Sequence, residues 1–340
     1  MFFIKNLSPK CLSVVKNPPL CYIYLVVLRR RVKKLKVFVP DYYLDFECIA
    51  EKCRHSCCKG WEIEIDDETA QYYKNIPGEF GEKLRRNIDF GEGCSNFILC
   101  ENECCSFLNE KGLCDIIINL GEDSLCQICA DHPRFRNYFE GRVEIGLGLC
   151  CEAAAVLILD KKTKVVLEAM IDDEDEEEIP DYEKAFFSLR DAVFEALQNR
   201  SMPIEKRMEA MLKICGGKLP EKSVSEWVKI FLGLERLEES WTKVLEHVAE
   251  EESFCVSTDE VTAEQLLYYF IFRHLSGGLF DGRIAERAVL AVLSFYMIQI
   301  AAKQVGIYEA ARLYSSEIEY SSENIEALLE IIALENEVFL

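Results

Sequence analysis

The cysteine-dense stretch CIAEKCRHSCCKGWEIEID, residues 48–66, decides the character of the fold because four of its first eleven residues are cysteines. Thiolates are soft metal ligands, and close spacing lets one loop supply several of them at little cost in loop-closure entropy. From Trp61 onward, apolar and charged side chains alternate, which predicts a short half-buried strand. The stretch therefore predicts an irregular metal-binding loop that leads into a strand.

Cysteine is concentrated well beyond this stretch, because 13 of the 17 cysteines lie within residues 48–151. A small secreted domain could hold so many cysteines as disulfides. This chain is long enough to fold without such cross-links, no convincing secretion signal is present, and adjacent pairs such as Cys57-Cys58 suit a crowded ligand shell. We therefore expect a metal site in a protein made for a reducing compartment, the cytoplasm.

The cysteines alone do not decide which metal is bound. Four thiolates suit either Zn²⁺ or an iron–sulfur cluster. The candidates outnumber the ligands of one tetrahedral site, so a cluster with buried spectator cysteines and two separate sites both stay open. An iron–sulfur cluster is the preferred interpretation, and a structural zinc site is the alternative.

Composition places the chain among folded proteins with an acidic surface. Its 340 residues are 50% hydrophobic and carry a net charge of −21. That hydrophobic content supports one large or two modest domains and excludes a disordered chain. The negative charge argues against a nucleic-acid partner, since phosphate binding needs a basic surface. It favours a cationic partner, such as a lysine-bearing protein.

Composition also divides the chain into four parts. Residues 1–35 form a basic N-terminal extension that we expect to lie outside the fold. Its short apolar run cannot span a bilayer, so membrane association is not expected, and a peripheral anchor is the alternative. Residues 36–171 form the predicted cysteine-rich metal-binding domain, and residues 181–340 the predicted helical domain. Residues 172–180 form an acidic linker between them, because a run of acidic residues closed by a proline is typical of a solvated loop.

Helical periodicity dominates the second half of the chain. Apolar residues at three- and four-residue spacing predict helices over residues 181–199, 203–214, 283–304 and 321–337. Residues 221–249 are predicted to form one long helix or two short ones. A further helix is predicted to begin at Thr262, where Gln265 completes a capping box, and to end at Gly277-Gly278. In the cysteine-rich part, residues 66–73 and 79–88 are predicted helices and residues 142–149 a strand. The fold class is therefore mainly α: an irregular cysteine-rich N-terminal region with a few short strands, followed by an all-α helical bundle.

Four motifs carry a resemblance to a known family. They are Cys53-Arg-His-Ser-Cys57-Cys58-Lys-Gly-Trp61-Glu-Ile-Glu-Ile-Asp66, Cys105-Ser-Phe-Leu-x3-Gly-Leu-Cys114-Asp-Ile, Leu125-Cys126-x2-Cys129-x3-Pro133-Arg134 and Leu149-Cys150-Cys151-Glu152-Ala153-Ala154. Together they resemble the flagellin lysine-N-methylase family over about residues 36–320. Ser106 and Cys151 stand where that family often has proline, so the choice of ligand between adjacent cysteines stays open.

The resemblance implies methyl transfer from S-adenosylmethionine to lysine Nε atoms of flagellin, with a 4Fe–4S cluster involved. It also implies nine metal-ligand candidates in this chain: Cys48, Cys53, Cys57, Cys58, Cys105, Cys114, Cys126, Cys129 and Cys150. The rival interpretation is a non-enzymatic zinc- or iron-binding module with a helical interaction domain.

The residues themselves assign neither a donor site nor a catalytic residue. The chain lacks the Gly-rich strand-to-helix turn of Rossmann methyltransferases. Gly60 also stands where a radical Cys-x3-Cys-x2-Cys signature would have its third cysteine. Methylation requires a neutral amine, whereas free lysine has a pKa of about 10.4, so a base or a desolvating pocket must remove the proton. His55, inside the first cysteine group, is a candidate for a ligand or a base, and a solvent-facing loop histidine is the simpler interpretation.

Overall fold

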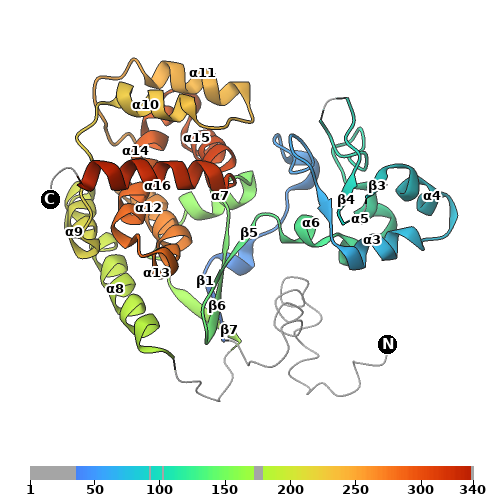
Figure 1. The fold of residues 1–340 in the computed structure, drawn as a ribbon, viewed down its shortest axis with the longest axis horizontal. Helices are drawn as coiled ribbons and strands as arrows, with labels where there is room; N and C mark the ends of the chain where they lie inside the picture. Colours follow the sequence, from blue (N-terminus) through green and yellow to red (C-terminus); the bar gives the residue numbers. More distant parts are fainter. Residues whose placement is uncertain (1–35, 92, 102, 172–178, 338–340) are drawn as a thin grey trace.

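The computed structural model describes residues 36–91, 93–101, 103–171 and 179–337. Within them helices predominate and the strands are few and short, which confirms the predicted fold class. The described residues form a large and a small lobe around separate hydrophobic cores (Figure 1). The predicted extension and most of the predicted acidic linker lie outside the described residues, so the domain boundaries stay predictions.

The large lobe contains a mixed four-stranded sheet in the order β5-β6-β1-β7. Its strands are β1 (Lys36–Pro40), β5 (Arg134–Tyr138), β6 (Arg142–Leu147) and β7 (Leu167–Ile171). β1 pairs in parallel with β6, whereas β5–β6 and β1–β7 are antiparallel. Buried side chains of these strands belong to the same hydrophobic core as the helices that follow. The sheet, although it falls in the cysteine-rich half of the sequence, is therefore part of the helical lobe.

Helices cover this sheet and form the rest of the large lobe (Figure 1). They are α7 (Glu152–Leu159), α8 (Asp181–Leu197), α9 (Ile204–Cys215), α10 (Val224–Gly233), α11 (Glu239–Val248), α12 (Glu260–His274), α13 (Gly278–Asp281), α14 (Ile284–Val305), α15 (Ile307–Tyr314) and α16 (Ser322–Glu337), with a π-helical turn, η6, at Ser315–Glu319. Among the described helices, α14 alone is long and apolar enough to cross a membrane, yet 72% of its most apolar window is buried. That burial is expected of the core helix of a soluble protein.

Most predicted helices are confirmed, and the exceptions have local causes. Residues 221–249 form two helices, α10 and α11. The predicted start at Thr262 was wrong because Asp259 caps α12, accepting the N–H groups of Val261 and Thr262. The predicted stop at Gly277-Gly278 was also wrong, because α12 already ends at His274 and a 3-10 turn at Leu275–Gly277 leads directly into α13. Both glycines keep right-handed helical angles, and the chain turns only at Gly282, whose φ is +76°.

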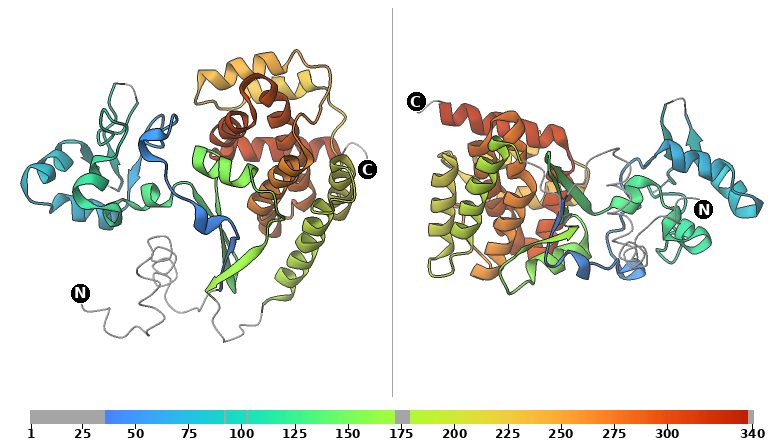
Figure 2. Two further views of the ribbon diagram at one scale, coloured as in Figure 1. Left: turned by 180° about the vertical axis from the view of Figure 1, so that it is seen from behind. Right: turned by 90° about the horizontal axis from the view of Figure 1, so that it is seen from below.

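The small lobe spans residues 58–129 and is inserted between β1 and β5. It contains β2 (Glu64–Ile65), α3 (Asp67–Lys74), α4 (Gly78–Arg86), β3 (Ile88–Phe90), β4 (Ser95–Phe97) and α5 (Asp115–Leu120), and α6 (Gln127–Asp131) leads out of it. The strand predicted from Trp61 is confirmed only at Glu64–Ile65. Both views of Figure 2 show this lobe beside the large one, joined by the segments after β1 and before β5. We call residues 47–57, which lead into the small lobe, the bridging loop.

A buried ion pair ties the sheet of the large lobe to α8. Both carboxylate oxygens of Glu144, on β6, accept hydrogen bonds of 2.6 Å from Arg190, on α8. Arg142 also contacts Glu144. Burial acts to raise the pKa of Glu144, but the two arginines hold it below its usual range.

Replacing Glu144 with Gln is expected to lower the free energy of unfolding by about 3–5 kcal/mol at pH 7, because Arg190 would be left buried without its counter-charge. The pKa of Glu144 lies lower in the folded chain than its unfolded value of about 4.3. The stabilisation is therefore present above that pH and is lost as the pH falls through the folded-state pKa. Urea unfolding curves of the two proteins should approach each other as the pH falls below about 4.3 and should coincide only once it is below the folded-state pKa of Glu144.

Glu209→Gln is the matched control, because the pair between Glu209 and Lys206 is exposed. Its loss should change the free energy of unfolding by less than about 1 kcal/mol. Equal destabilisation by the two variants would contradict the role given to Glu144.

Candidate metal centre

Three thiols of the bridging loop lie within electrostatic range of a fourth thiol, which belongs to the large lobe. Cys48, Cys53 and Cys57 belong to the loop, and Cys151 is the N-cap residue of α7. Burial raises the pKa of Cys151, and nearby Cys53 and Cys48 raise it further. Cys57 lies within electrostatic range of Cys48 and Cys151 as well. We call these four residues the junction thiols.

Five further thiols pack in the core of the small lobe, and we call them the small-lobe thiols: Cys58, Cys105, Cys114, Cys126 and Cys129. The backbone N–H of Cys105 donates to the carbonyl of Cys58 at 2.8 Å. Burial raises the pKa of Cys105 to about 12. The Cys129 thiol donates a hydrogen bond to Cys126, which lowers the pKa of Cys126. A similar bond from Cys57 lowers the pKa of Cys58 and links the two sets.

Cys150 is the predicted ligand that joins neither set. Burial raises the pKa of its thiol to about 12, and the thiol is hydrogen-bonded to Tyr320 beside Arg273. The Arg273 guanidinium lies over the ring of Tyr320 and pairs with Glu319 at 3.3 Å. Cys150 therefore faces the helices of the large lobe, while its neighbour Cys151 faces the loop.

The donor set fits a metal that prefers sulfur. All cysteines among the described residues are free thiols. The junction thiols supply four soft donors, the number that zinc and iron–sulfur clusters take. As they stand, no three His, Cys, Asp or Glu side chains of the described residues converge closely enough to hold one ion. The nine ligand assignments therefore stay predictions, and the structure arranges all of them except Cys150 in two neighbouring sets.

His55 lies between two carboxylates next to the junction thiols. Its Nδ1 is 2.5 Å from Glu152 Oε1, and its Nε2 is 3.5 Å from Glu309. Burial acts to raise the pKa of Glu152, but the hydrogen bond from His55 and the charge of Arg54 hold it below its usual range. The side chain of His55 is 32% exposed, so an approaching substrate group can reach it. Its suggested role as ligand or base stays a prediction.

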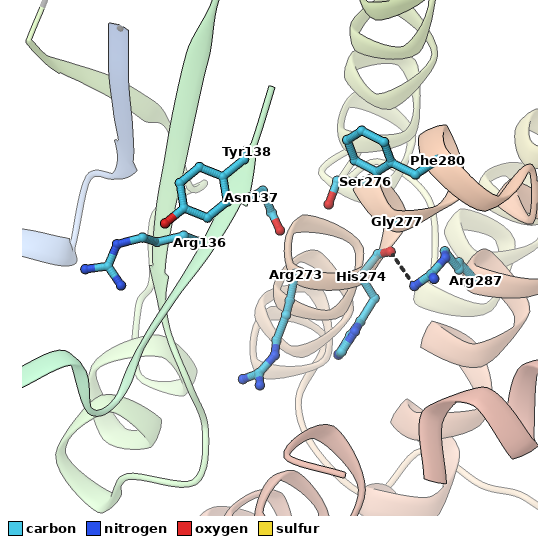
Figure 3. A pocket seen from close by; sticks show the side chains of 9 residues that line it. All are labelled: Arg136, Asn137, Tyr138, Arg273, His274, Ser276, Gly277, Phe280 and Arg287. Atoms are coloured by element: carbon cyan, nitrogen blue, oxygen red, sulfur yellow. Dashed lines mark hydrogen bonds between the residues drawn. The ribbon is translucent and has the colours of Figure 1, made fainter. Parts of the chain in front are cut away.

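A shallow hollow of about 410 Å³ lies between β5 and the segment from α12 to α14 (Figure 3). Three arginines among its lining residues each pair with a carboxylate: Arg136 with Asp131 at 2.6 Å, Arg273 with Glu319 at 3.3 Å and Arg287 with Asp281 at 2.5 Å. In Figure 3 the guanidinium groups of Arg136 and Arg273 point away from Phe280 and Ser276. The charges of these arginines are therefore already balanced, and the hollow is not assigned as the site for the carboxylate of a methyl donor.

Glu152 is a residue of this site whose role has no signal in the sequence. It directly follows the Cys150-Cys151 pair, and an acidic residue in the first turn of a helix is ordinary. Its partners Arg54 and His55 are 98 and 97 positions away along the chain. No local pattern reports a contact over that distance, so only the fold reveals it.

Comparisons with known proteins point to the same family as the motifs do, through a different part of the chain. Residues 165–339 match the model of the FliB lysine N-methylase C-terminal domain. Two lysine-N-methylases, from Salmonella choleraesuis (strain SC-B67) and Salmonella typhimurium (strain LT2), are each 28% identical to the chain over 145 residues. These matches cover 40% of this chain and 35% of each relative, so the chain spans about a third of their length. No solved structure matches the chain. Because the domain match covers half of its residues, the chain belongs to the flagellin lysine-N-methylase family.

Proposed function

We propose that this chain is an S-adenosylmethionine-dependent protein-lysine N-methyltransferase that acts on flagellin in the cytoplasm and carries a 4Fe–4S cluster. The observation that carries the proposal is the match of residues 165–339 to the lysine N-methylase domain. The free thiols support the cofactor, because thiolates are the usual ligands of such clusters.

A 4Fe–4S cluster takes four thiolates, so the junction thiols would supply one complete set and the small-lobe thiols a second candidate set. The amino and carboxylate groups of the methyl donor would bind a cluster iron by replacing one of these thiolates. The small-lobe thiols lie within a hydrophobic core that limits the access of water. The junction thiols lie closer to the surface, where a large protein substrate can approach, since Cys48 and Cys57 are exposed.

The chain must also deliver a neutral lysine amine. Deprotonating a lysine with a pKa of about 10.4 at pH 7 costs about 4.6 kcal/mol. Burial can lower a lysine pKa by as much as about 3–5 units, so desolvation in a closed site would be sufficient. The net charge of −21 attracts lysine-bearing segments before that step.

The rival function is a metal-binding module without enzymatic activity. The observation that favours it is that the thiols form two sets, one of them packed in the hydrophobic core of the small lobe. The two functions differ in whether a methyl group is transferred, which an assay of the metal-loaded chain decides.

Incubation of the anaerobically purified full chain with labelled S-adenosylmethionine and unfolded flagellin is expected to label lysine side chains. Peptide mass spectrometry would locate the added methyl groups. Flagellin whose lysines have been replaced with arginine is the control and should take up no label. A metal-loaded chain that leaves unfolded flagellin unlabelled would contradict the methyltransferase proposal and favour the rival.

Protein purified without oxygen is expected to be brown and to contain iron together with acid-labile sulfide, because the thiols suit an iron–sulfur cluster. Metal analysis and the visible absorption spectrum check this. Colourless protein with stoichiometric zinc would rule out the cluster, although it would leave a thiolate metal site in place.

A further inference from the structure

One carboxylate fastens the bridging loop to the large lobe. Oε1 of Glu152 accepts the backbone N–H groups of Arg54 and His55 at 3.0 and 2.9 Å. The same oxygen is 2.5 Å from Nδ1 of His55, and Oε2 is 3.6 Å from Nε of Arg54. A single side chain therefore holds two consecutive peptide groups and two side chains of the loop.

Glu152 is well placed for this task because its own position is fixed. It is the first residue of α7, where free backbone N–H groups and the helix dipole favour a carboxylate. Ala154 and Ala155, one turn further on, are fully buried in the core of the large lobe. The carboxylate itself is only 14% exposed, so water competes little for its hydrogen bonds.

His55 of the bridging loop also contacts a second helix of the large lobe, α15. Nε2 of His55 lies 3.5 Å from Glu309 of α15, and Arg312 of α15 pairs with that glutamate at 2.8 Å. α15 packs against α7. The loop is therefore anchored to two helices of the large lobe at one place, through His55.

The contact between Glu152 and the bridging loop has a cysteine next to it in sequence on each of the two segments that it joins. Glu152 follows Cys151, and Arg54 follows Cys53. The Cys53 thiol donates to the carbonyl of His55 at 3.3 Å, so Cys53 and the anchored residues form one hydrogen-bonded unit. Any shift of α7 relative to the loop would move Cys151 relative to Cys53.

We propose that Glu152 is a positioning residue that docks the bridging loop on α7, and that Cys151, rather than Cys150, completes a four-thiol site with Cys48, Cys53 and Cys57. The metal centre is then shared between the loop and the first turn of a large-lobe helix. The site takes a sulfur-preferring metal, as zinc or as part of an iron–sulfur cluster. This inference rests on the proposed function only for the presence of that metal.

Disulfide mapping tests the arrangement without metal or activity. The metal-free full chain is oxidised briefly with diamide, and its disulfides are identified by peptide mass spectrometry. Cys151 is expected to be joined to the junction cysteines of the loop at least fivefold more often than Cys150. The proposal is overturned if Cys150 is joined to them as often as Cys151.

Cysteine variants test the same choice through metal binding. After anaerobic reconstitution with ferrous iron and sulfide, Cys151→Ser is expected to hold at least fivefold less iron than the unchanged chain. Cys150→Ser should stay within twofold, because its thiol faces Tyr320. A loss in Cys150→Ser with none in Cys151→Ser would reverse the assignment.

Variants of Glu152 distinguish a role in positioning the bridging loop from a role that depends only on the negative charge of the carboxylate. Glu152→Ala removes the acceptor and is expected to lower bound iron at least fivefold and to change the cluster spectrum. Glu152→Gln keeps an amide oxygen for the two backbone N–H groups and should restore iron to within twofold and recover the spectrum. Glu226→Gln is the matched control, since Glu226 accepts the backbone N–H of Ser223 at 2.8 Å in the first turn of α10, away from the cysteines.

Normal iron in Glu152→Ala, or equal losses in the Ala and Gln variants, would overturn the positioning role. Circular dichroism of each metal-free variant checks that the helices remain formed. If the unchanged chain binds neither iron nor zinc, the proposed cofactor fails, whereas disulfide mapping still decides whether Cys151 or Cys150 faces the loop.

Discussion

The hydrogen bonds from the bridging loop to the carboxylate of Glu152 fix the cysteines of that loop relative to the helices of the large lobe. Hydrogen bonds to a charged group contribute about 1.5–3 kcal/mol each. Two backbone bonds and one from His55 therefore amount to a large fraction of the roughly 5–15 kcal/mol that stabilises a typical domain. Because Cys53 and Cys151 each adjoin this contact in sequence, the geometry of the junction thiols depends on it.

Glu152 is held in place because buried ion pairs fix the helices and strands of the large lobe to one another. Glu144 joins β6 to α8, and Glu264 of α12 pairs with Arg207 of α9 at 3.0 Å. Such pairs add little net stability once desolvation is counted, but breaking one is costly, so they favour one arrangement over others. α7 also contacts α12 and α15, so its first turn is held by the same framework.

Local patterns predicted the helices well because their causes are local. Gly216, with φ of +72°, ends α9 as the sequence indicates. The start of α12 was missed because Asp259 and Thr262 are both good caps, and their backbone angles decide between them. The parallel pairing of β1 with β6 joins segments on either side of the small lobe and leaves no local signal. The same limit applies to the site: residue chemistry identifies thiol candidates, whereas their division into two sets and the contacts of Glu152 arise from long-range packing.

Hydrogen–deuterium exchange of the full chain, measured before and after chelation, shows whether the metal centre is shared by the bridging loop and α7 of the large lobe. Exchange reports local opening, which becomes more frequent where a bound ligand is lost. A shared centre predicts that metal removal speeds exchange both in the bridging loop and in the hydrogen-bonded amides of α7, from Ala155 onward. Faster exchange confined to the small lobe, with α7 unchanged, would contradict it.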